Sequence, residues 1–376
     1  MDSPEVEEQK TSKSARLEDL GIVLSGGGSR AAYQLGVLRA LNKHLFNGSI
    51  NPSVLVGSSI GAVNSIVFGA ALQGGATSAI EVTEEIWKKR TFSNTFSGSI
   101  PRSFLKAVQV AFLRYSSPGP QASKVSIFNP LPLQNQIQDI LEEYGGIQNK
   151  KSAKDLSVVA VMTTVEGVQR KPLLLGKVLN NKTEMNLEGA SFDFHKVDKF
   201  KASHGLASAA LPSVLPSVDL DIEADNVKLV DGGICDNLPV DPALRLGAKN
   251  VILIDVSGRR WWFDHYGEPH DTRPTWEIPS SDKTFCLYPD YFIECRNKIG
   301  LGTLLKQVVG KSTRNFIQAA GPTWPIFKIL KHKMGEELAY EVMSYVALHP
   351  EYTQALIECG FNETTSLLEN TSWISI

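Results

Sequence analysis

The chain has 376 residues, of which 42% are hydrophobic and 21% charged, and this composition is typical of a globular protein. Its net charge of −2 argues against a nucleic-acid-binding protein, which needs a basic surplus to neutralise phosphates. The cysteines form neither a Cys-x-x-Cys pair nor a metal-ligand spacing, so we expect free thiols and no metal site at Cys235, Cys286, Cys295 and Cys359.

The first 19 residues are polar and charged, without the apolar core of a signal peptide. They are predicted to be a disordered tail on a cytoplasmic protein. The main domain is expected to span residues 20–257, and residues 258–376 to form an irregular insertion and C-terminal helices packed on that domain.

The first ordered elements predicted are a buried strand at residues 21–24, a glycine-rich loop, and a helix from Ala31 to Leu45. Two interpretations of the loop remain open. Its Gly26-x-Gly28-x-x-Ala31 pattern fits a dinucleotide-binding fingerprint, but the acidic residue expected about 20 residues later is missing. Alternatively, its backbone N–H groups form an oxyanion hole, and Arg30 adds positive charge or braces the loop.

The next strand and helix meet at Gly57-Ser58-Ser59-Ile60-Gly61, which is a Gly-x-Ser-x-Gly pattern. A short apolar strand before it and a helix-compatible run after it are the context of a nucleophile elbow. Ser59 would then lie at a helix N-terminus, where free N–H groups and the helix dipole stabilise a developing oxyanion.

The stretch from Val54 to Leu72 has no charge and is near the length of a membrane span. Its glycine, serine and asparagine residues instead favour a buried strand followed by a buried helix. Two strand-helix units in succession predict a parallel sheet with right-handed crossovers.

Further along, helices are predicted at residues 81–90 and 131–144. Between them, Pro101 to Tyr115 carries an apolar helical stripe with basic residues mostly off it. Such a helix either packs on the core or lies on an anionic membrane surface, where it can act as a lid.

In the second half, strands are predicted at 156–164, 171–175, 226–230 and 251–256, and a helix of small residues at 201–212. The strand at 226–230 ends at Asp231, and an acid at the carboxyl end of a strand is where an open parallel sheet holds functional groups. After residue 257 the pattern becomes irregular, and then predicts helical stretches at 297–320 and 335–359.

A serine nucleophile needs a base, and the residues alone leave two kinds open. His265 or His270 would complete a triad in the order Ser, Asp, His, although neither follows a predicted strand. A carboxylate is the other candidate, provided that partial burial raises its proton affinity.

Four motifs between residues 20 and 256 resemble the patatin-like phospholipases: Gly26-Gly27-Gly28-Ser29-Arg30, Gly57-Ser58-Ser59-Ile60-Gly61, Ala207-Ser208-Ala209-Ala210-Leu211-Pro212, and Asp231-Gly232-Gly233 with Asn237 and Pro239. The resemblance implies a three-layer α/β/α fold with a mostly parallel sheet, followed here by a helical C-terminal extension. It implies a Ser59–Asp231 dyad without histidine, metal or cofactor. It assigns oxyanion N–H groups to Gly26, Gly27, Gly28 and Ile60, and supporting roles to Arg30, Gly57, Gly61, Gly232, Gly233 and Asn237. Many members have glycine where Ala31 stands here.

The same resemblance implies hydrolysis of phospholipids or related acyl esters through an acyl-enzyme, by a protein bound peripherally to membranes. An acyltransferase with the same dyad is one alternative, because an acyl-enzyme can pass its acyl group to an alcohol. A non-catalytic lipid-binding protein on this fold is another, although a retired site need not keep both Ser59 and Asp231.

Overall fold

The computed structural model describes residues 19–97, 126–148, 153–257, 292–294 and 300–370, except residues 168, 181, 183 and 224. The strands are β1 (Leu20–Leu24), β2 (Val54–Ser58), β3 (Val158–Val165), β4 (Pro172–Val178), β5 (Asp193–Lys196), β6 (Val218–Ile222), β7 (Asp225–Asp231), β8 (Asn250–Asp255) and β9 (Phe292–Glu294). The helices are α2 (Ala32–His44), α3 (Ile60–Ala71), α4 (Ala76–Lys88), α5 (Phe92–Thr95), α7 (Leu131–Glu143), α8 (Ala202–Ala209), α9 (Val240–Arg245), α11 (Gly300–Val308), α12 (Thr313–Ala320), α13 (Trp324–Met334), α14 (Glu336–Met343) and α15 (Pro350–Asn370). The predicted helix from Pro101 to Tyr115 lies outside the described residues.

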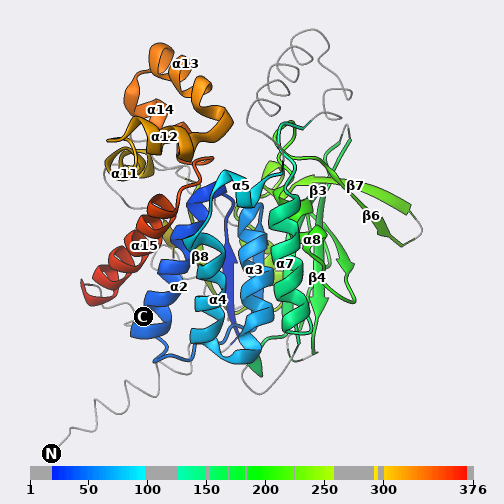
Figure 1. Ribbon diagram of the computed structural model, residues 1–376. Helices are drawn as coiled ribbons and strands as arrows, with labels where there is room; N and C mark the ends of the chain where they lie inside the picture. Colours follow the sequence, from blue (N-terminus) through cyan, green and yellow to red (C-terminus); the bar gives the residue numbers. More distant parts are fainter. Residues whose placement is uncertain are drawn as a thin grey trace, which may run out of the picture.

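One mixed sheet organises the molecule (Figure 1). Its strand order is β5-β4-β3-β2-β1-β8-β9, with β7 paired to β3 and β6 paired to β7. The central strands β3, β2, β1 and β8 are mutually parallel. β1 and β2 are buried along their whole length, because their aliphatic side chains meet helices on both faces. The parallel sheet predicted from two successive strand-helix units is therefore confirmed.

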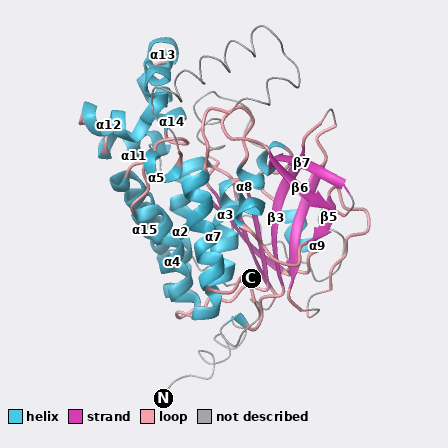
Figure 2. Cartoon of the chain, turned by 45° about the vertical axis from the view of Figure 1, so that its right-hand side comes forward, coloured by secondary structure: helices cyan, strands magenta, loops and turns pink. Residues whose placement is uncertain are grey.

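Helices cover both faces of this sheet and give the α/β/α layering (Figure 2). Alternate side chains of a strand point to opposite faces. Ile22 and Leu55 join the larger apolar cluster under α2, α3 and α4. Val23 and Val56 join a smaller cluster under α9. The stretch from residue 54 to 72 is thus mainly β2 and α3, and no helix among the described residues is long and apolar enough to span a membrane.

One expectation about the sheet is wrong. β7 does not belong to the parallel part of the sheet, because it runs antiparallel to β3, with Asp231 opposite Thr163. β3 also pairs with β2, where Met162 lies opposite Ser58. An antiparallel strand that descends along the end of β3 therefore delivers Asp231 to the level of the elbow, although the polarity of that strand differs from the prediction.

The C-terminal region contains more helices than the two predicted stretches. The first stretch is broken between α11 and α12, and the second between α14 and α15, while α13 was not predicted. Gly335, with a φ of 89°, separates α13 from α14, and Pro350 begins α15. α15 packs along α2 at close range, since a Cβ on Gly360 would collide with the carbonyl oxygen of Tyr33.

Candidate active site

Ser59 occupies a sharp turn between β2 and α3. Its φ of 52° and ψ of −130° are uncommon for a residue with a side chain and mark local backbone strain. Two glycines allow this turn to form. A Cβ on Gly57 would lie 2.5 Å from the carbonyl oxygen of Gly61, and one on Gly61 would lie 2.5 Å from that of Ser25. The strand, turn and helix have the geometry of a nucleophile elbow.

The Asp231 carboxylate lies directly beside this serine. The Ser59 hydroxyl donates a hydrogen bond to Asp231 Oδ2 over 2.7 Å. The other carboxylate oxygen, Oδ1, accepts the N–H of Gly233, also at 2.7 Å. The hydroxyl of Thr164 donates to the backbone carbonyl of Asp231 at 2.8 Å. Asp231 is only 5% exposed, so these contacts hold its side chain in one orientation.

Burial changes the acidity of this carboxyl group. It raises the pKa of Asp231 from 3.8 to about 6, because an apolar surrounding disfavours the charged form, while hydrogen bonds from Ser59 and Gly233 lower the pKa in part. A carboxylate with this pKa is still ionised at neutral pH and is a stronger base than an exposed one. Asp231 therefore has the properties that a general base requires.

The Asn237 side chain connects the Asp-Gly-Gly turn to the glycine-rich loop. Its Oδ1 accepts the N–H of Gly26 at 3.1 Å, and its Nδ2 donates to the Gly26 carbonyl at 3.3 Å. A Cβ on Gly26 would lie 2.6 Å from the Cβ of Ser59, so this glycine packs directly against Ser59. Because its N–H is engaged by Asn237, Gly26 does not offer the oxyanion donor that was expected of it.

The other expected donors are Gly27, Gly28 and Ile60. Among the described residues, none of their three N–H groups donates a hydrogen bond. Gly28 has a φ of 59°, and a Cβ there would collide with the carbonyl oxygen of Tyr345. Gly28, Ile60 and Ser59 all line one cavity. These unpaired N–H groups are therefore available to bind an oxyanion.

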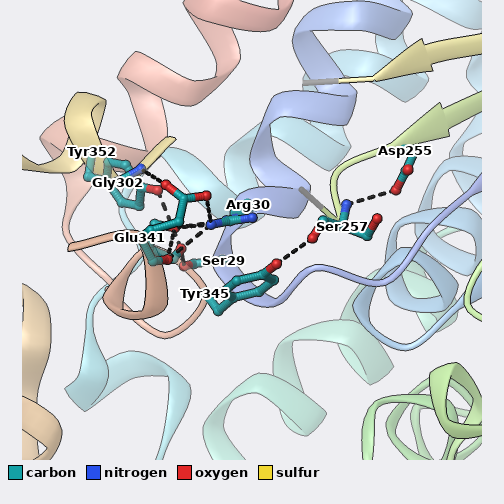
Figure 3. A network of polar contacts seen from close by, with 9 residues as sticks. Ser29, Arg30, Asp255, Ser257, Gly302, Glu341, Tyr345 and Tyr352 are labelled. Carbon is teal, nitrogen blue, oxygen red and sulfur yellow. Dashed lines mark hydrogen bonds and ion pairs between the residues drawn. The ribbon is translucent and has the colours of Figure 1, made fainter. Parts of the chain in front are cut away.

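Arg30 is fully buried and extends toward the C-terminal helices (Figure 3). It forms an ion pair with Glu341 and donates from Nε and Nη2 to Ser344 Oγ at 2.8 and 2.6 Å. Its guanidinium also lies 3.6 Å from the centre of the Tyr345 ring. Glu341 in turn accepts the N–H of Gly302 at 2.7 Å. Of the two roles foreseen for Arg30, these contacts support bracing of the loop.

The turn between α14 and α15 holds the glycine-rich loop from outside. The Ser29 N–H donates to the carbonyl of Tyr345 at 2.8 Å, and the Ser29 hydroxyl donates to the carbonyl of Ser344 at 2.8 Å. In Figure 3 the Tyr345 hydroxyl reaches the carbonyl of Ser257. A dinucleotide-binding loop would need the Ser29 N–H for a pyrophosphate, so this contact argues against that interpretation.

A cavity opens beside Ser59 and Asp231. Both residues line it, and its volume is about 200 Å³. Its remaining wall is mostly apolar and comes from α3, α4, α5, α7, α8 and the turn after α14, with Val63, Ile86, Trp87, Phe92, Phe96, Phe128, Leu133, Leu206, Leu215 and Leu348. The Ser59 hydroxyl therefore lies at the wall of a mostly apolar cavity, which is the lining typical of a small-molecule site.

Histidines do not contribute to this site within the described residues, because none of them lines the cavity. His204 has a structural role: its Nδ1 accepts the N–H of Lys201 at 2.8 Å at the start of α8, and burial lowers its pKa to about 4. The alternative bases His265 and His270 lie outside the described residues. Among the described residues, no cluster of His, Cys, Asp and Glu side chains could hold a metal ion.

Comparison with known proteins gives the following matches. A family model described as patatin-like phospholipase matches residues 22–244. The chain is 26% identical over 240 residues to patatin-like phospholipase domain-containing protein 7 of Rattus norvegicus, an alignment that covers 64% of this chain and 14% of that protein. The chain thus spans about one seventh of this relative's length.

Among solved structures, human GIVD cytosolic phospholipase A2 aligns with a TM-score of 0.41 and 11% identity, covering 96% of this chain and 61% of that one. VipD from Legionella pneumophila aligns with a TM-score of 0.34 and 13% identity, covering 94% and 67%.

Proposed function

We propose, from the premise that this chain belongs to the patatin-like phospholipase family, that it hydrolyses carboxylic esters of phospholipids or related acyl lipids. The observation that carries the proposal is the 2.7 Å hydrogen bond from Ser59 to Asp231 at the wall of an apolar cavity. A nucleophile, a base with a raised pKa and space for an acyl chain are then present together.

The reaction follows from these positions. Asp231 accepts the hydroxyl proton while Ser59 Oγ attacks the ester carbonyl carbon. The carbonyl oxygen becomes an oxyanion, which the N–H groups of Gly27, Gly28 and Ile60 stabilise. Asp231 then gives the proton to the departing alcohol or lysolipid, and the acyl group stays on Ser59. Asp231 next takes a proton from a water molecule, whose oxygen attacks the acyl carbon. The bond from that carbon to Ser59 Oγ breaks, the fatty acid leaves, and Asp231 returns the proton to Oγ.

The activity is tested with a diacyl phospholipid in micelles and with a soluble monomeric ester. We expect release of free fatty acid from both, and covalent labelling of Ser59 by a fluorophosphonate, detected by mass spectrometry. Adding glycerol or lysolipid separates hydrolysis from acyl transfer, because a transferase would form a new acyl ester at the expense of free fatty acid. A folded protein that cleaves neither ester would contradict the proposal.

The rate should depend on the ionisation of Asp231. Below its pKa of about 6 the carboxyl group is protonated and cannot accept the serine proton, so kcat/KM should rise about tenfold per pH unit and level off above that value. Initial rates on the soluble ester between acidic and neutral pH measure this profile. A rate that stays flat across this range, or that falls as the pH rises toward neutrality, would exclude Asp231 as the base.

A further inference from the structure

A few large hydrophobic side chains remain exposed to solvent. Among the described residues these are Leu131, Leu211, Ile326, Ile329 and Met334. Leu211 lines the cavity itself. Leu131 is the first residue of α7. Two residues earlier, Asn129 forms a β-bridge with Ser97, which follows α5 by two residues in the sequence. The other three side chains lie on α13.

α13 is attached to the wall of the cavity at its N-terminal end. The preceding turn contains Gly321, where a Cβ would lie 2.5 Å from the ring of Phe92, and Phe92 lines the cavity. Leu348, another lining residue, donates its N–H to the carbonyl of Ala319 at 2.8 Å. Figure 1 shows α13 projecting past the same end of the sheet as α5. α13 therefore stands beside the entrance.

The packing of α13 leaves Ile326 and Ile329 uncovered, while Trp324 and Leu330 are partly buried against the core. Only Phe327 is buried, with its ring 4.5 Å from that of Phe316 and 4.8 Å from that of Tyr340, measured between centroids. Ile326 is 41% and Ile329 56% exposed. A helix of a soluble domain normally turns such residues toward the core, because their exposure to water costs free energy. This helix instead presents them to the outside.

The charge of α13 indicates what covers that face. The helix contains no acidic residue and ends in Lys331, His332 and Lys333, with Lys328 one turn earlier. Lys331 is paired with Glu336 at 2.5 Å, and Lys328 Nζ lies 4.1 Å from the centre of the Trp324 ring. All three lysines, Lys328, Lys331 and Lys333, are exposed to solvent. Exposed isoleucines next to exposed lysines are the composition of a helix that lies in the interface of an anionic bilayer.

We propose that α13, together with Leu131 and Leu211, is the surface by which this protein docks on a bilayer containing anionic lipids. Ile326 and Ile329 enter the acyl region, and Lys328 and Lys333 meet lipid phosphates. Docking in this way faces the cavity toward the bilayer, so that a lipid reaches Ser59 without passing through water. Only this last step rests on the proposed function, since the docking itself requires no chemistry.

The experiment measures sedimentation of the protein with vesicles of phosphatidylcholine and phosphatidylserine, in a Ser59→Ala background that forms no product. Ile329→Glu should weaken vesicle binding by about tenfold or more, since it places a charge where the isoleucine would enter the acyl region of the bilayer. Lys328→Glu should weaken binding at low salt, and less so at high salt or without phosphatidylserine.

Two matched controls lie at the opposite end of the molecule. Ser49→Glu introduces one negative charge at an exposed position before β2, and Lys43→Glu reverses an exposed charge at the end of α2. Both controls should bind vesicles as the background protein does. Circular dichroism of Ile329→Glu should match that of the wild type, because the Ile329 side chain is 56% exposed and fills no space in the core.

With Ser59 restored, Ile329→Glu should hydrolyse the soluble ester normally and a vesicle lipid about tenfold more slowly. The docking proposal would be overturned if Ile329→Glu bound vesicles as strongly as the wild type does, or if the wild type did not bind vesicles at all. A wild type that dimerises in ultracentrifugation, with a monomeric Ile329→Glu and no vesicle binding, would assign the face to a second copy. Vesicle binding that depends on Ile329 without any ester hydrolysis would leave the docking surface standing and remove the proposed function.

Discussion

Ser59→Ala should lower hydrolysis of a soluble ester by a factor on the order of 10⁴ or more, because removing a nucleophile leaves only binding and oxyanion stabilisation. The fold should survive, since the Ser59 side chain makes a single hydrogen bond, to Asp231. Initial rates and fluorophosphonate labelling measure the effect. Ser58→Ala is the matched control: its hydroxyl donates to the carbonyl of Asp236 at 2.8 Å, away from the dyad, and its loss should leave labelling intact.

Asp231→Asn tests the other half of the same prediction and should lower the rate comparably. Although this variant should lose activity, its folded state should be as stable as that of the wild type or more so. The pKa of Asp231 rises from 3.8 to about 6 on folding, so its burial makes the folded state less stable as the pH increases from about 4 to 6, and the loss persists above that. A neutral asparagine avoids this loss, and thermal unfolding at neutral pH should occur at the same temperature or higher. An Asp231→Asn variant with near-normal rates would disprove the dyad.

Glu341→Ala should lower the free energy of unfolding by about 3–5 kcal/mol, because it leaves the guanidinium of Arg30 buried without a counter-charge. Arg30 and Glu341 are 0% and 2% exposed, so water cannot replace the lost partner. Urea denaturation measures the change. Glu336→Ala is the control on the same helix: Glu336 pairs with Lys306 and Lys331 but is 37% exposed, so its loss should cost less than about 1 kcal/mol.

The same contact should affect catalysis as well as stability. Glu341→Gln keeps the shape of the side chain and an acceptor for the Gly302 N–H, but removes the charge that pairs with Arg30. A less firmly held glycine-rich loop should lower kcat more than it changes KM, since the N–H groups of Gly27 and Gly28 act on the oxyanion of the transition state. Equal stability and equal kcat in Glu341→Gln and Glu336→Gln would show that bracing by Arg30 has no consequence.

The local parts of the site could be predicted from the sequence because the backbone itself demands their residues. Gly61 must be glycine, since a Cβ there would meet the carbonyl oxygens of Leu24 and Ser25. Gly233 has to place its N–H on Asp231, and a Cβ there would crowd the amide oxygen of Asn237. Such requirements leave a pattern over a few neighbouring positions, and a pattern of that kind can be recognised without a structure.

The non-local parts had no comparable signal. Glu341 reaches Arg30 across 311 residues, and Asn237 reaches Gly26 across 211, so no spacing links either pair. The antiparallel pairing of β7 with the end of β3 is a tertiary contact, which no local pattern encodes. α13 escaped prediction because Phe327 is its only buried residue, and one buried position cannot produce a periodic apolar stripe facing the core.

The bracing of Arg30 has a consequence for how the protein is made. A ribosome synthesises the N-terminal residues first, so Arg30 emerges 311 residues before Glu341. At about 5–20 residues per second, the nascent chain carries an unbraced glycine-rich loop for roughly 15–60 s. The elbow and its aspartate are complete long before the loop is held in place. The glycine-rich loop is thus held in place only after Glu341 and its helix have left the ribosome.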